Sequence, residues 1–343
     1  MATADPAVRT DKVLEEVTGG PQHDAGKESR DSGPAGTAPA SGRTTSGRKS
    51  RGRTVPGRVQ RALFVSPSVL TLLVLAAYPL VFIASAAFTE SSLGKPFQEF
   101  VGTANVETAL ASAGIRGSLL LGTGYAFAVA LASTLLGVIT AVALHRSLHS
   151  GPVVRTALLL PMIVPPVVVG ILFSFVFSPS GGLLDTLISR FTPASGTYAI
   201  LSDTTWAIVG VGIADVWEWT PLVVLLVFTA LLGQDPEITE AARLDGARGV
   251  RLFGHITLPA VAGTIAAAFL IRLILAFKVF DLVYVMTSGG PGSSTLVPAY
   301  LIWRTALQSF DVGMAATITL LLAVIVTVVT LPVFLIVRRL RHG

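Results

Sequence analysis

The chain alternates between long apolar blocks and shorter polar ones. Six apolar blocks each exceed the roughly 20 residues that an α-helix needs to cross the hydrocarbon of a bilayer. We therefore predict an all-α integral membrane protein with six transmembrane helices, over residues 62–89, 117–144, 156–177, 204–232, 260–287 and 312–337. The second block carries small residues suited to close helix packing, Gly122, Gly124, Ala128, Ala132 and Gly137.

A polar interruption at 235–259 separates the fourth and fifth blocks. Asp235 is a helix-capping residue, and Pro236 is tolerated at a first helical position, where the missing N–H needs no partner. Gly246 can enter a left-handed turn without steric cost. An apolar stripe then restarts, and Pro259 fits the first turn of the next span. This pattern predicts a short helix, a glycine turn and a second short helix.

Residues 1–58 have almost no aliphatic or aromatic clusters and are rich in Gly, Ala, Ser, Thr, Pro and charge. We predict a disordered, basic cytoplasmic tail, because such a composition cannot bury enough apolar surface to fold alone. The segment Gly42 to Ser50 comes near a phosphate-binding loop, but it has an inserted Arg48 and no strand before it. The tail is not expected to be a signal peptide, because the first apolar block follows Arg61. Residues 59–343 form the predicted six-span domain.

Composition supports a polytopic membrane protein: 52% of the residues are hydrophobic, only 13% are charged, and the mean hydropathy is +0.71. There is no cysteine, which excludes disulfides, thiolate metal sites and cysteine nucleophiles. His145 and His149 lie four residues apart beside Arg146, and we interpret them as a solvated loop pair rather than metal ligands. We expect no metal site and no catalytic residues in this chain.

Basic residues in the short flanks indicate the orientation, since cytoplasmic flanks carry an excess of Lys and Arg. One side has Arg51, Arg53, Arg58, Arg61, Arg146, Arg155, Arg243, Arg248, Arg251, Arg338, Arg339 and Arg341; the other has Lys95, Arg116, Arg190 and Arg304. Both termini and the 235–259 loop are therefore predicted to face the cytoplasm. This topology explains the basic surface, so nucleic-acid binding is not expected.

Five ionisable residues fall inside the predicted spans, Asp215, Glu218, Arg272, Lys278 and Asp281. Such groups are costly in hydrocarbon unless they face a water-filled cavity or a partner. We prefer a pair between Arg272 and Glu218, on neighbouring spans. A place on a translocation pathway and a purely structural role remain equal alternatives for this pair. Helix-end positions favour the structural role for Lys278 and Asp281.

The 235–259 loop resembles the EAA signature of permease subunits of ABC importers. The resemblance rests on Glu240-Ala241-Ala242, on Gly246 after three intervening residues, and on Ile256-x-Leu258-Pro259. It implies the type I importer permease fold, with a core over about 113–337, and a coupling loop (235–259) that docks on a cytoplasmic ATPase. The coupling residues it implies are Glu240, Ala241, Ala242, Asp245, Gly246, Val250, Phe253, Ile256, Leu258 and Pro259.

A second set of residues resembles the sugar permeases of the maltose and glycerol-3-phosphate type. These are Leu160-Pro161-x-x-Val164-Pro165, Trp217, Phe280-Asp281, residues 287–292, Tyr300 and Asp311-x-Gly313-x-Ala315-Ala316. Together the resemblance covers roughly residues 60–340. Carried along the chain, it places solute-lining positions on Ser178, Gly182, Arg272, Leu275, Ala276 and Val279. Leu, Ala and Val replace the amides and aromatic of the maltose-binding member, so the resemblance implies the position of the pocket but not maltose as ligand, and simple helix packing is the favoured alternative for Leu275 and Val279.

The resemblance implies that this chain is a transport subunit, not an enzyme, and binds no cofactor itself. ATP and Mg belong to two partner ATPase subunits, and a second homologous permease and an extracytoplasmic binding protein complete the importer. The expected solute is a sugar or oligosaccharide. One alternative is glycerol-3-phosphate or another polar solute, with Arg272 as a phosphate partner. The other is a secondary transporter with an intramembrane charge relay, which dependence on an ATPase would distinguish.

Overall fold

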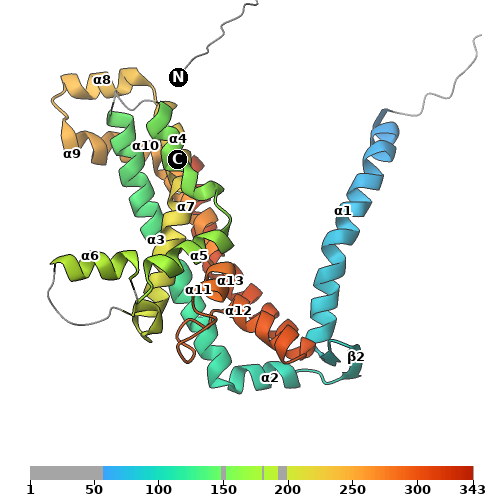
Figure 1. Cartoon of the computed structure of the whole chain (residues 1–343). Helices are drawn as coiled ribbons and strands as arrows, with labels where there is room; N and C mark the ends of the chain where they lie inside the picture. Colours follow the sequence, from blue (N-terminus) through green and yellow to red (C-terminus); the bar gives the residue numbers. More distant parts are fainter. Residues whose placement is uncertain (1–56, 148–151, 180, 192–198, 343) are drawn as a thin grey trace, which may run out of the picture. The chain divides into compact units, whose positions relative to one another are not determined.

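The computed structural model describes residues 57–147, 152–179, 181–191 and 199–342, nearly all of them in one unit, Arg61–Gly343. Five described helices are long and apolar enough to cross a membrane: α1 (Gly57–Ala87), α3 (Ala113–Arg146), α7 (Trp206–Leu232), α10 (Leu258–Ala276) and α13 (Val312–His342) (Figure 1). Four predicted spans coincide with α1, α3, α7 and α13 apart from a few end residues. The tail at 1–56, with its near phosphate-binding loop, lies outside the described residues.

The third predicted span is broken rather than straight. It consists of α4 (Pro152–Leu159), the 3-10 turn η1 (Leu160–Ile163) and α5 (Pro166–Val176). The two halves are bent by 100°, so the chain has a sixth span only if this bent pair crosses the membrane as one. The break falls at Val164-Pro165, directly before Pro166 at the start of α5, because proline lacks the N–H that would continue the helical ladder and clashes with the preceding turn.

The fifth predicted span, 260–287, is wrong as a single helix. Helix α10 ends at Ala276, and a short helix α11 (Asp281–Met286) follows after an irregular segment. The interruption coincides with Lys278 and Asp281, the two charges that interrupt the apolar run. Beyond it come α12 (Pro298–Trp303) and the π turn η4 (Arg304–Gln308), which lead into α13.

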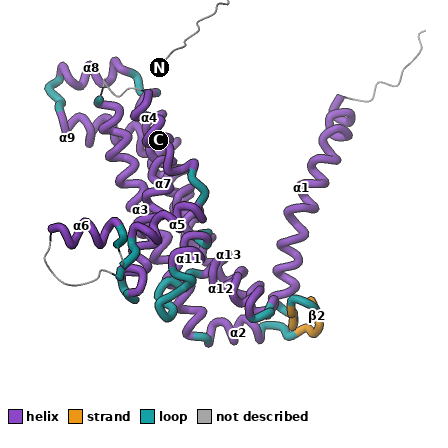
Figure 2. Tube along the Cα trace, in the orientation of Figure 1, coloured by secondary structure: helices purple, strands orange, loops and turns teal. Residues whose placement is uncertain are grey.

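The predicted all-helical membrane fold is confirmed, and the described residues add one small two-stranded hairpin to it. Strands β1 (Thr89–Ser92) and β2 (Lys95–Phe100) pair in an antiparallel hairpin after α1, drawn orange in Figure 2, and α2 (Ala104–Ala111) follows. The Asn105 amide donates hydrogen bonds to Ala87 O (3.0 Å) and Thr89 O (3.2 Å). Thr317 on α13 donates to the same Ala87 oxygen at 3.2 Å. The end of α1 is thereby fixed to α2 and α13.

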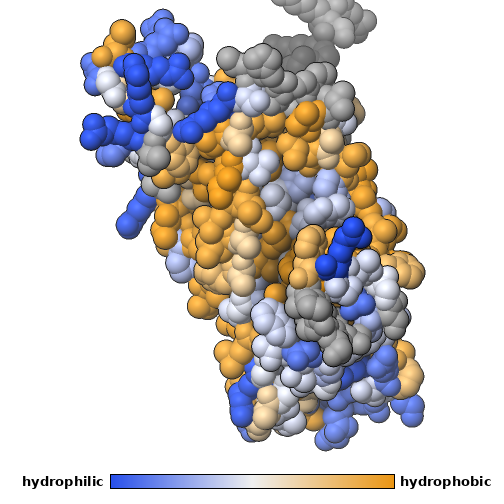
Figure 3. All heavy atoms as spheres, turned by 60° about the vertical axis from the view of Figure 1, so that its left-hand side comes forward, coloured by the Kyte–Doolittle hydropathy of each residue, from blue (hydrophilic) through white to orange (hydrophobic). Residues whose placement is uncertain are grey.

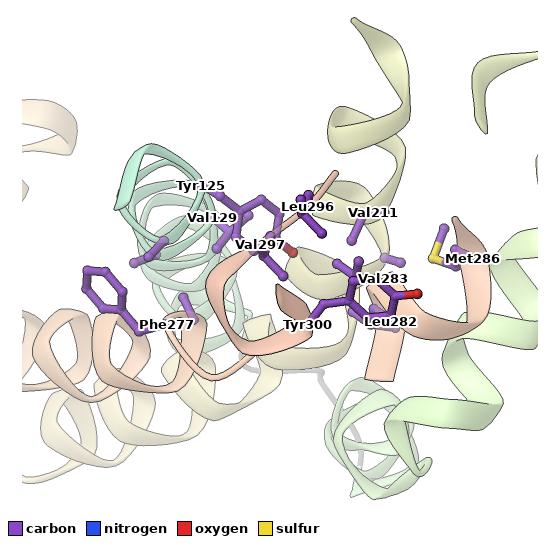
Figure 4. Close-up of a cluster of buried hydrophobic side chains, with 14 of the residues drawn as sticks. Tyr125, Val129, Val211, Phe277, Leu282, Val283, Met286, Leu296, Val297 and Tyr300 are labelled. Atoms are coloured by element: carbon purple, nitrogen blue, oxygen red, sulfur yellow. The ribbon is translucent and has the colours of Figure 1, made fainter. Parts of the chain in front are cut away.

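Helix α3 packs closely on α7 and α12 because two of its glycines leave room for neighbouring side chains. A Cβ at Gly137 would lie 2.6 Å from Val223 Cβ, and one at Gly122 would lie 2.6 Å from Pro298 Cγ. The prediction of close packing is confirmed at both positions, but a Cβ at Gly124 would meet nothing within 4 Å. The main core lies between α3, α7, α10, α11 and α12, where Figure 4 shows Tyr125, Val211, Val283 and Tyr300 among the buried side chains.

The remaining elements lie toward the ends of these helices. Helix α6 (Leu183–Phe191) and the 3-10 turn η2 (Ile200–Ser202) connect α5 to α7, and α8 (Pro236–Leu244), α9 (Gly249–Leu252) and the π turn η3 (Phe253–Thr257) connect α7 to α10. Figure 3 shows a broad hydrophobic surface over the bundle, with hydrophilic side chains at the end that carries α8 and α9 and again at the opposite end. Figure 1 places the C-terminus at the same end as α8 and α9.

Candidate functional site

The coupling loop begins as the sequence predicts. Asp235 caps α8, since its side-chain oxygen accepts a hydrogen bond from the backbone N–H of Glu237 at 2.9 Å. Pro236 occupies the first turn, where its missing N–H costs nothing. The helix therefore has a fixed starting point three residues after α7 ends at Leu232.

Helix α8 ends at a Schellman cap built on Gly246. This glycine has φ +86°, a left-handed conformation that it adopts without the penalty of a Cβ. The backbone N–H of Ala247 bonds Ala242 O at 2.9 Å, and that of Gly246 bonds Arg243 O at 3.1 Å. These are the two hydrogen bonds of the motif. The predicted helix, glycine turn and second helix are confirmed.

The coupling loop exposes apolar side chains on α8 rather than on the stripe after it. Leu244 is 90% exposed and Ile238 is 58% exposed, whereas Phe253 and Ile256 are half-buried. Sequence reasoning did not select Ile238 or Leu244, although an exposed apolar residue in a charged helix is a signal for contact with a partner. Glu240, Ala241, Asp245, Gly246, Leu258 and Pro259 are exposed, Ala242 is half-buried, and the side chain of Val250 lies outside the described part.

A π turn joins the coupling loop to the membrane. In η3 the N–H of Leu258 bonds Phe253 O, five residues back instead of four. Helix α10 starts directly from this turn with Pro259 in its first turn, as the sequence predicts. Such turns insert one extra residue into a helix and occur often at functional sites.

A buried polar network joins three spans near the middle of the bundle. Arg272 on α10 is fully buried, and its Nη2 lies 2.7 Å from Asp215 Oδ1 on α7. Two side chains of α3 complete the network. The Tyr125 hydroxyl donates to Asp215 Oδ2 at 2.8 Å, and Arg272 Nε donates to Ser133 Oγ at 3.1 Å. A buried ion pair is tolerated only when further hydrogen bonds satisfy both partners.

The preferred pair of Arg272 with Glu218 is wrong: Arg272 pairs with Asp215. Both acids lie on α7, one turn apart and on the same face, so residue spacing alone does not separate them. Asp215 is distinguished by the tyrosine hydroxyl of α3, which gives its second oxygen a donor. Arg272 therefore pairs with the acid whose two oxygens both receive donors, one from α3 and one from α10.

Two buried atoms beside this pair have no hydrogen-bond partner among the described residues, Glu218 Oε2 and Arg272 Nη1. Glu218 is only 2% exposed. Unpaired polar atoms at such depth are few in native proteins, and they occur where water binds or where groups change partners. The sequence pointed to both residues because both are ionisable inside a span.

A cavity of about 1060 Å³ lies between α3, α7 and the α4–η1 segment. Its wall is almost wholly apolar, with Tyr125, Thr140, Trp217 and Thr220 supplying the polar atoms, and none of its lining residues is charged. The glycine Gly124, which packs against nothing, borders this space. Trp217 is 41% exposed, and its ring meets Phe173 edge to face at 5.6 Å.

The expected pathway residues do not border that cavity. Ala276 is 1% exposed in the core, while Leu275, Val279 and Ser178 are half-buried. Gly182 is buried in a tight turn after α5, where a Cβ would lie 2.9 Å from Phe175 O. Their solute contacts stay a prediction.

In the part of the chain that the structure describes, no three His, Asp or Glu residues are placed to hold a metal ion. The polar features of the described bundle are therefore the coupling loop, the Tyr125–Asp215–Arg272–Ser133 network with Glu218, and the largely apolar cavity.

Comparison with known proteins identifies the arrangement. The sequence model of the family described as "Binding-protein-dependent transport system inner membrane component" matches residues 133–342. The trehalose/maltose transport system permease protein MalF of Thermococcus litoralis is 30% identical over 256 residues, covering 72% of this chain and 82% of that protein. The sn-glycerol-3-phosphate transport system permease protein UgpA of Agrobacterium fabrum is 28% identical over 286 residues, covering 82% and 95%.

A solved structure has the same fold. A chain of a bacterial ABC transporter involved in the import of the acidic polysaccharide alginate superposes with a TM-score of 0.73 at 21% identity, covering 82% of this chain and 98% of that one. The same transporter type has been solved in complex with an alginate pentasaccharide-bound periplasmic protein.

Proposed function

The chain belongs to the family of binding-protein-dependent transport system inner membrane components and is a permease subunit of an ABC importer, and from that premise we propose that its solute is a carbohydrate. It is a multi-pass membrane protein and a non-catalytic transport subunit. The relatives support the solute class: besides the trehalose/maltose permease, the trehalose permease SugA of Mycobacterium tuberculosis is 28% identical over 262 residues.

The observation that carries the proposal is the uncharged cavity beside Trp217. Sugars are neutral, and they bind through aromatic faces and hydroxyl groups set in otherwise apolar walls. The cavity is lined by an indole ring and by Tyr125, Thr140 and Thr220, and its lining contains no charged side chain; the Tyr125 hydroxyl donates its proton to Asp215 and can only accept a hydrogen bond from a solute. Its volume of about 1060 Å³ suits a solute larger than a monosaccharide.

The same geometry disfavours glycerol-3-phosphate. A phosphate needs a cation that it can reach, and the arginine expected for that role is not available to it. Arg272 is fully buried, and two of its nitrogens are engaged by Asp215 and Ser133. UgpA, the relative named for glycerol-3-phosphate, is as similar as the sugar permeases, so overall identity does not separate the two solutes.

The partners follow from the coupling loop and the family. We infer a second homologous permease, two ATPase subunits that hydrolyse Mg-ATP, and an external binding protein. The exposed Leu244 and Ile238 of α8 supply apolar anchors, and Glu240 and Asp245 supply charge around them. A short, capped helix with exposed apolar side chains suits insertion into a groove on a partner. Both termini would then face the cytoplasm with this loop.

Solute-dependent ATP hydrolysis tests the proposal. The permease would be purified with its partner subunits and its binding protein, reconstituted in nanodiscs, and assayed with trehalose, maltose or glycerol-3-phosphate. We expect a neutral sugar to stimulate ATP hydrolysis and to be taken up in proteoliposomes. Stimulation by glycerol-3-phosphate alone would overturn the carbohydrate assignment. Uptake that is driven by an ion gradient without ATP would favour the secondary-transporter alternative instead.

A matched pair of variants tests the cavity. Trp217→Ala removes the indole face, whereas Trp206→Ala removes an indole that is 58% exposed at the start of α7, away from the cavity. We expect Trp217→Ala to reduce sugar uptake and Trp217→Phe to retain part of it, because a ring remains. Equal uptake by Trp217→Ala and the Trp206→Ala control would remove the cavity from the pathway.

A further inference from the structure

We propose that helix α6 lies in the membrane–water interface on the side of the membrane away from the coupling loop, with its apolar face immersed among lipid acyl chains. The inference concerns an interaction surface between this chain and the bilayer. It rests on the membrane-spanning architecture and does not depend on the solute proposed above.

The sequence of α6 divides into two stripes at helical spacing. One stripe is apolar, and it consists of Leu183, Leu184, Leu187, Ile188 and Phe191. The other is polar and charged, and it consists of Asp185, Thr186, Ser189 and Arg190. Residues that are three or four positions apart lie on one face of a helix, so the two stripes face in different directions. This division is typical of helices that lie in the plane of a membrane surface.

Most of the apolar stripe has no protein partner in the described structure. Phe191 is 80% exposed, Leu183 is 60% exposed and Leu187 is 47% exposed. Leu184 and Ile188 are half-buried, and Leu184 packs against the main core and so ties the helix to the bundle. Figure 1 shows α6 running sideways from the bundle. The side chains of Leu183, Leu187 and Phe191 are therefore not buried by the described part of the chain.

The order of the elements places α6 on the side of the membrane away from the coupling loop. It follows the end of α5 and precedes the start of α7, and α7 crosses the membrane to reach the coupling loop at its other end. Trp206 at the start of α7 is 58% exposed, and tryptophan is enriched at membrane–water interfaces. With nine residues, α6 is far shorter than the roughly 20 that a span needs.

Lipid is the occupant that this position favours. Phe175 and Ile171 on α5 are 71% and 44% exposed within the broken span, so the exposed apolar side chains of α6 follow directly on those of an apolar segment of the membrane domain. A soluble partner approaching from the aqueous side would meet the opposite stripe, with Asp185 and Arg190. The external binding protein would therefore contact the polar face and leave Leu187 in lipid.

Fluorescence quenching tests the depth directly, and the chain is suited to it because it contains no cysteine. Leu187→Cys and Ser189→Cys would each carry an environment-sensitive label, in the full chain assembled with its partner subunits in nanodiscs. The nanodisc lipids would carry a quencher either near the headgroup or near the end of the acyl chain, and iodide would serve as the aqueous quencher. Leu244→Cys on α8, 90% exposed, and Leu335→Cys on α13, 47% exposed, provide aqueous and lipid-facing controls.

We expect the label at position 187 to be quenched at least about twofold more by the headgroup-proximal lipid quencher than by iodide, and the label at position 189 to show the reverse order. Equal iodide quenching at both positions, at the level of the Leu244→Cys control, would place α6 in water and overturn the proposal. So would a label at position 187 that lipid does not quench and that addition of the binding protein shields.

Discussion

Removing the carboxylate of Asp215 is the sharpest test of the buried network. In Asp215→Ala the Arg272 guanidinium stays at a fully buried position and loses its ion-pair partner at 2.7 Å, while the Tyr125 hydroxyl loses its acceptor. Leaving a buried charge without its partner costs about 3–5 kcal/mol. We expect a loss of that size in the free energy of unfolding.

The double variant Asp215→Ala/Arg272→Met separates charge from packing. It removes both charges and keeps an apolar chain of similar length, and replacing a buried pair by apolar groups is often neutral or stabilising. We expect it to recover most of the stability lost in the single variant. Tyr125→Phe, which removes one hydrogen bond, should cost about 0.6 kcal/mol and no more than about 1.7 kcal/mol, the average and the maximum measured for hydrogen bonds between transmembrane helices.

Unfolding by SDS in mixed micelles, followed by the fluorescence of the four tryptophans, measures all three variants. The reasoning fails if Asp215→Ala costs no more than Tyr125→Phe, because Arg272 would then find other solvation as readily. It also fails if the double variant is less stable than Asp215→Ala. A double variant that folds normally but no longer transports would assign the pair a role in the transport cycle.

Three further predictions use the glycines and the helix cap. Gly246→Val places a β-branched side chain at φ +86° with nothing within 4 Å to clash, so the strained backbone alone should lower the stability of the loop by about 1–2 kcal/mol. We expect this variant to uncouple ATP hydrolysis from uptake. Gly246→Asn should stay coupled, because asparagine tolerates the left-handed conformation. If Gly246→Val instead blocks membrane insertion, the glycine serves folding only. Gly137→Ala should lower the melting temperature because its Cβ would meet Val223 at 2.6 Å, whereas Gly124→Ala points into open space and should not; equal shifts would contradict the packing. Asp235→Ala should destabilise α8 by about 0.5–2 kcal/mol and speed hydrogen exchange of its first turn, and unchanged exchange would remove the cap's role.

The spans and the coupling loop could be predicted from sequence because each depends on local properties. A long apolar run has few alternatives to a membrane helix, and Asp235 and Gly246 have conformational preferences that the loop uses directly. The close approach of α3 at Gly137 was also indicated by residue size. At these positions, local preference and tertiary structure agree.

The remaining features depend on contacts between distant residues. The choice of Asp215 over Glu218 is made by Tyr125, 90 residues earlier in the chain. The 100° bend at Pro165 could not be predicted, because hydropathy identifies the apolar run but does not tell whether its three prolines kink or break the helix. The β-hairpin at 89–100 has no strong alternating pattern, and its end is held by Asn105 and Thr317. The exposed Leu244 became visible only when the helix face was known.

The π turn η3 fixes the rotational register between the loop that carries α8 and α9 and the membrane helix α10. Adding one residue to a helix rotates everything beyond it by about 100°. The faces of α8 and α9 are therefore offset from the faces of α10 by the single extra residue held between Phe253 and Leu258. Converting that turn to regular α-helix would shift the register between the loop helices and α10 by one residue, against the link to α7 and the hydrogen bond from Gln234 to Thr257 O. Deleting one residue from this turn is therefore expected to rotate the loop helices relative to α10, in addition to shortening the chain.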